Sequence, residues 1–193
     1  ASYAGTASYA TNITVSGSIT NVDYIDFDTS VTFNNIAGRL GWDSGEYNLQ
    51  LGMYGGNLQM AVGEQMYQYV YNAQGSTLTK GQVVYVSGSQ GNRIAVKLAS
   101  ATAEFGSANT LGLVAETITA GGTGWVITDG TLRKVDTSGY EAGKLIYLSS
   151  SAGQYTQVST QAPLHNVRLG YIERVDNTAV SYTHLTLPTI LLV

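Results

Sequence analysis

The chain has 193 residues, of which 44% are apolar, enough for one mid-sized domain with a hydrophobic core and a smaller attached segment. Its net charge is -4 and only 11% of its residues are charged, so it lacks the positive field that nucleic-acid binding requires. It contains no cysteine, which excludes disulfides and thiolate metal sites, and no apolar run near the roughly 20 residues of a membrane span, so membrane insertion is not expected.

Residues 1–20 are of low complexity, and Ala1-Ser-Tyr-Ala4 recurs as Ala7-Ser-Tyr-Ala10. Small and hydroxyl-bearing residues of this kind cannot bury a core by themselves. We therefore expect either a linker or a segment that packs against copies of itself in an oligomeric shaft, and we favour the shaft.

Residues 21–65 are predicted to form a small β region. Ile25 and Phe27 alternate with polar residues, and Leu49 and Leu51 share one strand face, as period-two patterning predicts. The sequence Asp43-Ser-Gly45 suits a tight turn. Because the region has few large apolar residues, we expect partner chains to cover its open face and edges, most simply in a homotrimer.

Residues 66–178 are predicted to form a β-barrel-like domain, because turn signals recur at about ten-residue spacing without a long helical period. The apolar run from Val83 to Val86 predicts a strand that is buried on both faces. Asp129-Gly130 between two apolar runs predicts a two-residue hairpin turn. The fold class expected for the whole chain is all-β.

The larger domain contains an internal duplication. The stretch Gly81-Gln-Val-Val-Tyr-Val-Ser-Gly-Ser-Gln-Gly91 returns as Gly143-Lys-Leu-Ile-Tyr-Leu-Ser-Ser-Ser-Ala-Gly153. After each copy comes a second echo, in which Leu111-Gly-Leu-Val-Ala-Glu116 resembles Leu169-Gly-Tyr-Ile-Glu173. We expect two related β-units that place Tyr85 and Tyr147 in equivalent positions.

Residues 179–193 break this pattern. Val180-Ser-Tyr-Thr-His-Leu-Thr-Leu-Pro-Thr resembles the translation of a sequencing-library transposon end, a contaminant at the edge of assembled reads. On this interpretation the natural protein is cut near Thr178, and His184 and Pro188 are left out of functional reasoning. The alternative is a genuine final strand. Since no start methionine or secretion signal is present either, we expect an internal fragment of a longer protein.

Carboxylates are the main candidates for catalysis or metal binding. Glu116 and Glu173 occupy equivalent positions in the repeat and could act as a glycosidase pair, but we expect them to be polar residues that follow the strands. Asp23, Asp26 and Asp28 cluster without the glycine-hinged spacing of a calcium loop, so a solvated strand surface is expected.

Other catalytic signals are weak. His165 has no carboxylate at ligand spacing and is expected to be structural or exposed. The glycine-rich stretch Ala120-Gly-Gly-Thr-Gly124 lacks the Lys-Ser/Thr of a phosphate loop, and no Gly-x-Ser-x-Gly motif is present. We predict no catalytic residue, no metal site, no cofactor and no enzymatic activity.

Aromatic residues are the remaining candidates for binding. Trp42 and Trp125 could form a sugar-stacking platform, although each is isolated in its strand and core packing is favoured. Tyr67, Tyr69 and Tyr71 alternate along one strand and could form an exposed or inter-subunit stripe.

The sequence resembles the fibre-like virion structural proteins of tailed bacteriophages, particularly marine phages known from metagenomes. Three stretches show the likeness: the Ala-Ser-Tyr-Ala repeat with Gly17-Ser-Ile-Thr-Asn-Val-Asp-Tyr-Ile-Asp-Phe-Asp28; Gly56-Asn-Leu-Gln-Met-Ala-Val-Gly-Glu64 with Val70-Tyr-Asn72; and Gly81-Gln-Val-Val-Tyr-Val86, Gly112-Leu-Val114, Asp136-Thr-Ser-Gly139, Leu145-Ile-Tyr-Leu148 and Gly170-Tyr-Ile172. Together they cover most of residues 1–176. The last stretch is also similar to small capsid decoration proteins.

The resemblance implies a non-enzymatic, trimeric component of the virion, made in the host cytoplasm, that contacts other virion proteins. The leading hypothesis is a tail fibre segment that supports host attachment, with a host surface glycan as an open further partner. The alternatives are a head fibre or capsid decoration protein, and a carbohydrate-binding module of a bacterial surface protein. The resemblance supplies no catalytic residue.

Overall fold

The computed structural model describes residue 16, residues 18–175 and the backbone of residues 183–190. Strands make up 39% of the structure and helix 3%, which confirms the all-β prediction. The Ala-Ser-Tyr-Ala repeat lies outside the described residues. Within the described residues, no helix is long and apolar enough to cross a membrane.

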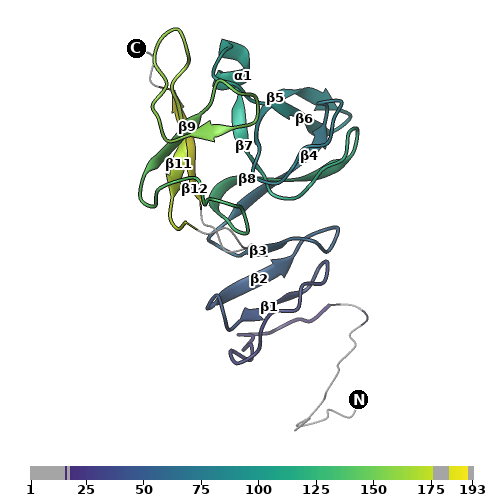
Figure 1. The fold of residues 1–193 in the computed structure, drawn as a ribbon. Coiled ribbons are helices and arrows are strands. Elements are labelled where there is room, and N and C mark those ends of the chain that lie inside the picture. Colours follow the sequence, from purple (N-terminus) through teal and green to yellow (C-terminus); the bar gives the residue numbers. More distant parts are fainter. Residues whose placement is uncertain (1–15, 17, 176–182, 191–193) are drawn as a thin grey trace, which may run out of the picture.

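A three-stranded antiparallel sheet lies nearest the N-terminus (Figure 1) and has the order β1-β2-β3. Its strands are β1 (Leu40–Asp43), β2 (Asn48–Gly52) and β3 (Gln59–Ala61). The expected turn at Asp43-Ser-Gly45 is present, and the Asp43 carboxylate accepts hydrogen bonds from the backbone of Phe33, Gly45 and Glu46. The strand expected around Ile25 and Phe27 is wrong, because residues 18–39 contain no strand and only their last two residues, Gly38 and Arg39, bond to the backbone of Gly52 in β2.

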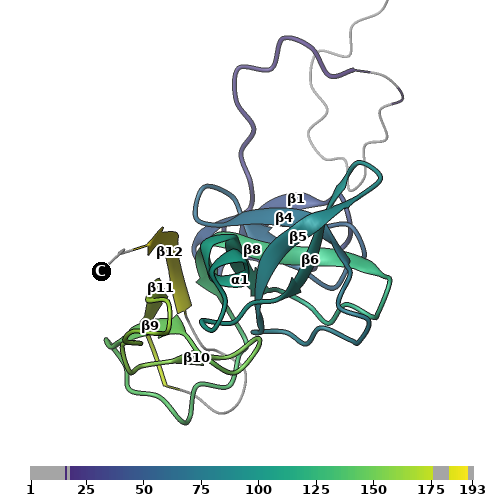
Figure 2. The same ribbon diagram turned by 90° about the horizontal axis from the view of Figure 1, so that it is seen from above.

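Five strands close into a barrel (Figure 2): β4 (Met66–Asn72), β5 (Val83–Gln90), β6 (Arg93–Leu98), β7 (Thr110–Val114) and β8 (Thr123–Leu132). Their order is β8-β4-β6-β5-β7, and a further pairing of β7 with β8 closes the ring. All pairs are antiparallel except β4–β6. The short helix α1 (Glu104–Ala108) precedes β7. One cluster of buried side chains belongs to this barrel: Val70, Leu78, Val84, Val96, Val114, Ile118 and Val126.

A second sheet extends from β8 and contains β9 (Leu145–Leu148), β10 (Tyr155–Thr156), β11 (Val167–Ile172) and β12 (Thr183–Ile190). Its order is β8-β12-β11-β9-β10. A second core cluster joins this sheet to the barrel and includes Val83, Leu113 and Ile127 from the barrel with Ile146 and Leu169 from the second sheet. Val83 and Val84 are both fully buried, one in each cluster, whereas Tyr85 and Val86 are half-buried, so the predicted burial on both faces is confirmed only for the first half of this run.

The two sequence repeats have the same strand register. The paired residues are Val83↔Leu113, Val84↔Gly112 and Tyr85↔Thr110 in β5–β7, and Leu145↔Tyr171, Ile146↔Gly170 and Tyr147↔Arg168 in β9–β11. Each ladder skips one residue at the same point, Leu111 in the first and Leu169 in the second. The predicted duplication is therefore confirmed, with Tyr85 and Tyr147 equivalent.

The equivalence extends to the order of all the strands. The first unit reads β4-β8-β7-β5-β6 and the second reads β8-β12-β11-β9-β10. In the hairpin that ends each unit, Leu113↔Ile127 and Val114↔Val126 correspond to Tyr171↔His184 and Ile172↔Thr183. Strand β8 is therefore the last strand added to the first unit and the first strand of the second. The second unit stays open, because no pairing of β10 with β8 occurs among the described strands.

The hairpin predicted at Asp129-Gly130 is wrong, since both residues lie inside β8. Asp129 pairs with Met66 of β4, and Gly130 pairs with Leu185 of β12. Gly130 has a positive φ of 94°, and a Cβ atom there would overlap the backbone of Glu64 and Gln65. Glycine therefore lets β8 pass close to this backbone at the point where β8 moves from the barrel to the second sheet.

Strand β12 lies in the terminal segment that was set apart in the sequence. Its backbone pairs with β11 along most of its length and with Gly130–Leu132 of β8. Backbone pairing does not test where these residues come from, so the foreign origin of residues 179–193 stays a prediction. Residues 176–182 lie outside the described part of the chain.

We predict that Gly130→Ala lowers the free energy of unfolding by at least about 2 kcal/mol, through a disfavoured backbone conformation and the overlap with Glu64. Gly55→Ala is the matched control, because Gly55 has a φ of 95° and open space where its Cβ would be. The control should cost about 1 kcal/mol. Denaturant unfolding of both variants measures the difference, and equal losses would show that the passage of β8 beside Glu64 is not constrained.

Candidate functional site

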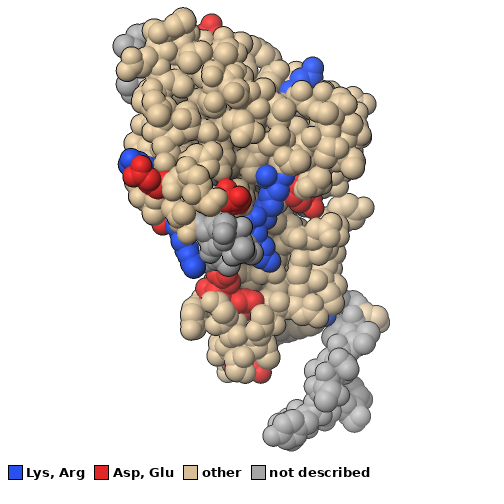
Figure 3. All heavy atoms as spheres, viewed as in Figure 1, with Lys and Arg blue, Asp and Glu red and all other residues tan. Residues whose placement is uncertain are grey.

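A pocket of about 470 Å³ lies where the three-stranded sheet meets the barrel, and we call it the inter-sheet pocket. Residues from β1–β3 and their loops form one side, and Tyr67, Lys80 and residues 132–134 form the other. In Figure 3, basic and acidic side chains lie next to one another at this level of the molecule. The lining of the pocket therefore combines charged and amide side chains with the apolar Leu58 and Leu132, in contrast to the two apolar core clusters.

Five amide side chains line the inter-sheet pocket: Asn35, Gln50, Asn57, Gln59 and Gln65. Several also hold the sheet to the barrel. The Gln65 side chain accepts from the Ala61 amide at 2.9 Å and donates to the carbonyl oxygen of Thr131. The Asn35 side chain donates to the carbonyl oxygen of Gly56 at 2.9 Å, while its own Oδ1 is buried without a hydrogen-bond partner.

Three basic residues line the barrel side of the pocket. Arg133 forms an ion pair with Glu46 and lies 4.0 Å from a carboxylate oxygen of Glu64. The ion pair with Glu46 connects the three-stranded sheet to the end of β8. Lys80 and Lys134 also line a second pocket of about 300 Å³ that contains Tyr140 and Tyr155.

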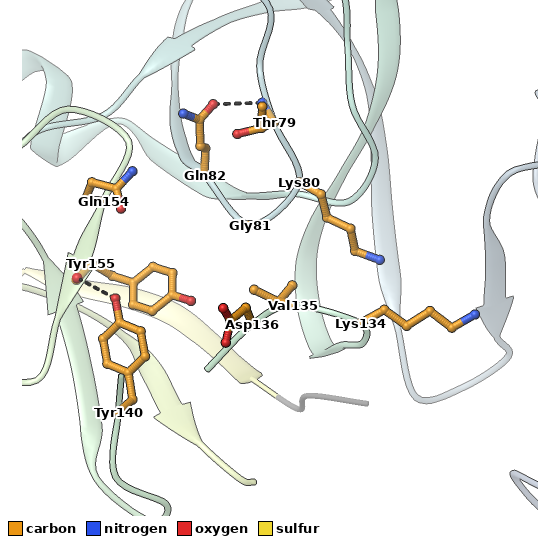
Figure 4. A pocket seen from close by; sticks show the side chains of 10 residues that line it. All are labelled: Thr79, Lys80, Gly81, Gln82, Lys134, Val135, Asp136, Tyr140, Gln154 and Tyr155. Atoms are coloured by element: carbon orange, nitrogen blue, oxygen red, sulfur yellow. Dashed lines mark hydrogen bonds between the residues drawn. The ribbon is translucent and has the colours of Figure 1, made fainter. Parts of the chain in front are cut away.

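Figure 4 shows the side chains of Lys80 and Lys134 running in the same direction, with their ammonium groups pointing away from Tyr140 and Tyr155. Neither ammonium has a hydrogen bond or an ion pair within the described residues. The two unpaired positive charges therefore lie together at the border of the two pockets.

The electrostatics of Lys80 reflect this arrangement. Burial, with a smaller contribution from the positive charge of Lys134, lowers the pKa of Lys80, and the Glu116 carboxylate opposes the shift. Burial also raises the pKa of Glu116, against hydrogen bonds from the Trp125 backbone and the Asn57 side chain. Both groups are partly buried, so a ligand charge beside Lys80 would be screened less than one at a fully exposed lysine.

The structure does not bring Glu116 and Glu173 into one of these pockets. Glu116 is half-buried in the loop after β7, beside Asn57 and Trp125. Glu173 follows β11, is exposed, and lines neither the inter-sheet pocket nor the pocket of Tyr140 and Tyr155.

The other predicted residues fall into separate places. Asp23, Asp26 and Asp28 are exposed on an irregular segment and not on a strand. His165 is half-buried, and its backbone amide donates to Ala101. The described residues contain no group of three or more histidine or acidic side chains that could hold a metal ion.

The two tryptophans do not form a platform. Trp42 lies in β1 beside a shallow pocket with Phe27 and Phe33, whereas Trp125 lies in β8 with its ring 4.6 Å from that of Tyr69. The indole NH of Trp125 donates to the carbonyl oxygen of Tyr54 at 3.1 Å.

The stripe of Tyr67, Tyr69 and Tyr71 in β4 is half-buried along its length. The interpretation of these tyrosines as an exposed stripe is therefore wrong. Tyr54 contacts the edge of the Tyr69 ring at 6.0 Å, and the guanidinium of Arg93 lies over that ring at 4.5 Å. Tyr69 and Trp125 therefore serve to seat the loop after β2 on the barrel.

Sequence reasoning missed the inter-sheet pocket and both of its lysines. Lys80 precedes the repeat glycine Gly81, and Lys134 ends the run Leu132-Arg-Lys134, so each looks like an ordinary turn residue in the sequence. The feature that sets Lys134 apart is its positive φ of 61°, which is uncommon for lysine and cannot be seen in the sequence. Comparison of the chain with known protein families, with curated proteins and with solved structures found no match.

We predict a loss of stability at alkaline pH from the tyrosines that border the two pockets. Burial raises the pKa of Tyr67 and Tyr155 above the ordinary value of 10.0. The contribution of these neutral tyrosines to the free energy of unfolding is fully present below pH 10. It is lost as the pH rises further, because the phenols ionise at a lower pH in the unfolded chain than in the folded one. The free energy of unfolding should fall by about 1.4 kcal/mol per pH unit for each such tyrosine.

Denaturant unfolding between about pH 9.5 and 11.5 tests this slope. Tyr67→Phe and Tyr155→Phe should each reduce it, whereas Tyr47→Phe, at a side chain that is 80% exposed, should leave it unchanged. An unchanged slope in both test variants would contradict the prediction.

Proposed function

We propose that the chain is a non-enzymatic structural segment of a bacteriophage virion, namely part of a trimeric tail fibre that supports host attachment. The observation on which this rests is the reversed distribution of apolar side chains in residues 18–62. Only Phe33, Met53 and Ala61 are buried apolar residues in this region. Ten large apolar or aromatic side chains are exposed there: Ile19, Val22, Tyr24, Ile25, Val31, Ile36, Leu40, Tyr47, Tyr54 and Val62.

A monomer does not gain stability from such an arrangement. Ile19, Tyr24 and Ile25 are 68%, 78% and 66% exposed, and each would bury apolar area if copies of the segment packed together. A symmetric oligomer does this with one repeated contact surface, and it also covers strand edges that a small sheet leaves open. An oligomeric shaft joined to a β-domain is the organisation that the resemblance to phage fibre proteins implies.

The location on the virion is part of the proposal. Tail fibres and capsid decoration proteins both suit a rigid β-domain with a low charge, and a head fibre or decoration protein is the second candidate. The duplicated barrel favours neither. The stacking of the three-stranded sheet below the barrel (Figure 1) favours an elongated component over a compact one, and this supports the fibre.

We predict that the full chain sediments as a trimer at micromolar concentration and that charges in the exposed N-terminal segment dissociate it. The double variant Tyr24→Asp/Ile25→Asp should weaken assembly at least about tenfold, because burying an unpaired charge costs several kcal/mol. Val158→Asp is the control, since Val158 is 74% exposed but lies in the loop after β10.

Sedimentation velocity across a concentration series measures the oligomeric state of the parent chain, the double variant and the Val158→Asp control. A stable monomeric parent chain, or equal dissociation of the control, would overturn the proposed fibre role.

A further inference from the structure

We propose that the inter-sheet pocket binds a saccharide that carries a carboxylate or sulfate group, with Lys80 and Lys134 holding the anionic group. The volume of about 470 Å³ suits one or two sugar rings. This binding step does not depend on the proposed function. Only the further step, that the ligand belongs to an acidic polysaccharide on the host surface, rests on the fibre role.

Several polar side chains that line the pocket make no contact within the protein. The ammonium groups of Lys80 and Lys134 have no ion pair or hydrogen bond among the described residues. The side-chain amide of Gln59 has no hydrogen bond in the described part of the chain either. Lys80 and Gln59 are half-buried and Lys134 is exposed, so all three remain available to a ligand that enters the pocket.

The charges on the lysines set the sign of the ligand charge. The positive charge of the exposed Lys134 acts on the half-buried Lys80 ammonium, and a single anionic group between the two offsets this repulsion. Arg133 does not compete for that anion, because Glu46 and Glu64 already neutralise it.

The amide lining favours a saccharide among anionic ligands. Sugar hydroxyls donate and accept at once, and the Gln59 side chain offers them both an acceptor oxygen and an NH2 donor. Nearby carboxylates of Glu46, Glu64 and Glu116 would repel a multiply charged phosphate chain but would accept bonds from hydroxyls. A ligand with one negative charge and several hydroxyls therefore fits the lining best.

The test is titration of the full chain, by calorimetry and by saccharide-observed NMR, with four probes. A galactosyl-galacturonate disaccharide and a monosulfated galactobiose supply the two anionic groups with one charged group each, neutral galactobiose supplies the rings alone, and inorganic sulfate supplies the charge alone. We expect at least one acidic disaccharide to bind, at least about tenfold more tightly than galactobiose or sulfate.

The variants locate the binding. Lys80→Gln/Lys134→Gln should weaken acidic disaccharide binding at least about tenfold. The control Lys97→Gln/Lys144→Gln makes the same change in net charge at two exposed lysines outside both pockets, and should bind as the parent chain does. Gln59→Ala should weaken the binding of the disaccharide but not of sulfate. Unchanged unfolding transitions in all variants show that the fold is intact.

Several results would overturn the proposal. Absence of binding by both acidic disaccharides at about 10 mM would remove the site, and equal loss in the lysine control would reduce it to general charge attraction. If sulfate bound as tightly as the acidic disaccharides, and Gln59→Ala weakened the binding of neither, the pocket would be a simple anion site. Sedimentation of the same samples keeps the two proposals apart, because a monomer that binds sugar contradicts only the fibre role, and a trimer that does not bind contradicts only the pocket.

Discussion

The continuity of β8 through Gly130 is the constraint on which the other parts of the structure depend. The first part of β8 completes the barrel by pairing with β4 and β7, and its last three residues begin the second sheet by pairing with β12. A hairpin at this point would have separated the two repeated units. Because the strand runs on, each unit uses β8 in a different role, and the apolar cluster between barrel and second sheet forms across it.

The direction of β8 also determines where the inter-sheet pocket forms. Leu132, the last residue of β8, is buried in the core, and the next residue, Arg133, pairs with Glu46 in the turn between β1 and β2. The Thr131 carbonyl accepts from Gln65 at the junction of β3 and β4. The sheet is thus held by polar contacts, by the Tyr54–Tyr69 contact and by Leu58, which packs against the larger core cluster. The inter-sheet pocket lies among the polar groups of this joint, whose complete burial would cost free energy.

Sequence patterning predicted what is local and repeated, and missed what depends on strands distant in the chain. The all-β class, the burial of Val83 and Val84 and the equivalence of Tyr85 with Tyr147 follow from periodicity and spacing, which the backbone register preserves. The hairpin predicted at Asp129-Gly130 is wrong because a glycine after an aspartate can indicate a turn or a close approach of two backbones. Here Gly130 allows β8 to pass close to the backbone of Glu64. The proximity of Lys80 and Lys134 could not be predicted from the sequence, since 54 positions separate them and only the closure of the barrel brings the start of β5 close to the end of β8.

The uneven distribution of apolar area follows from the same joint. Few apolar side chains take part in docking the three-stranded sheet on the barrel, among them Leu58 and Tyr54, and residues 18–40 leave Tyr24, Ile25 and Leu40 exposed. In the barrel, by contrast, strand pairing closes the ring and both core clusters are satisfied within one chain. The barrel therefore closes its core within a single copy, whereas residues 18–62 bury only Phe33, Met53 and Ala61 among their apolar side chains. Contact with another copy would thus bury more apolar area at the N-terminal region than at the barrel.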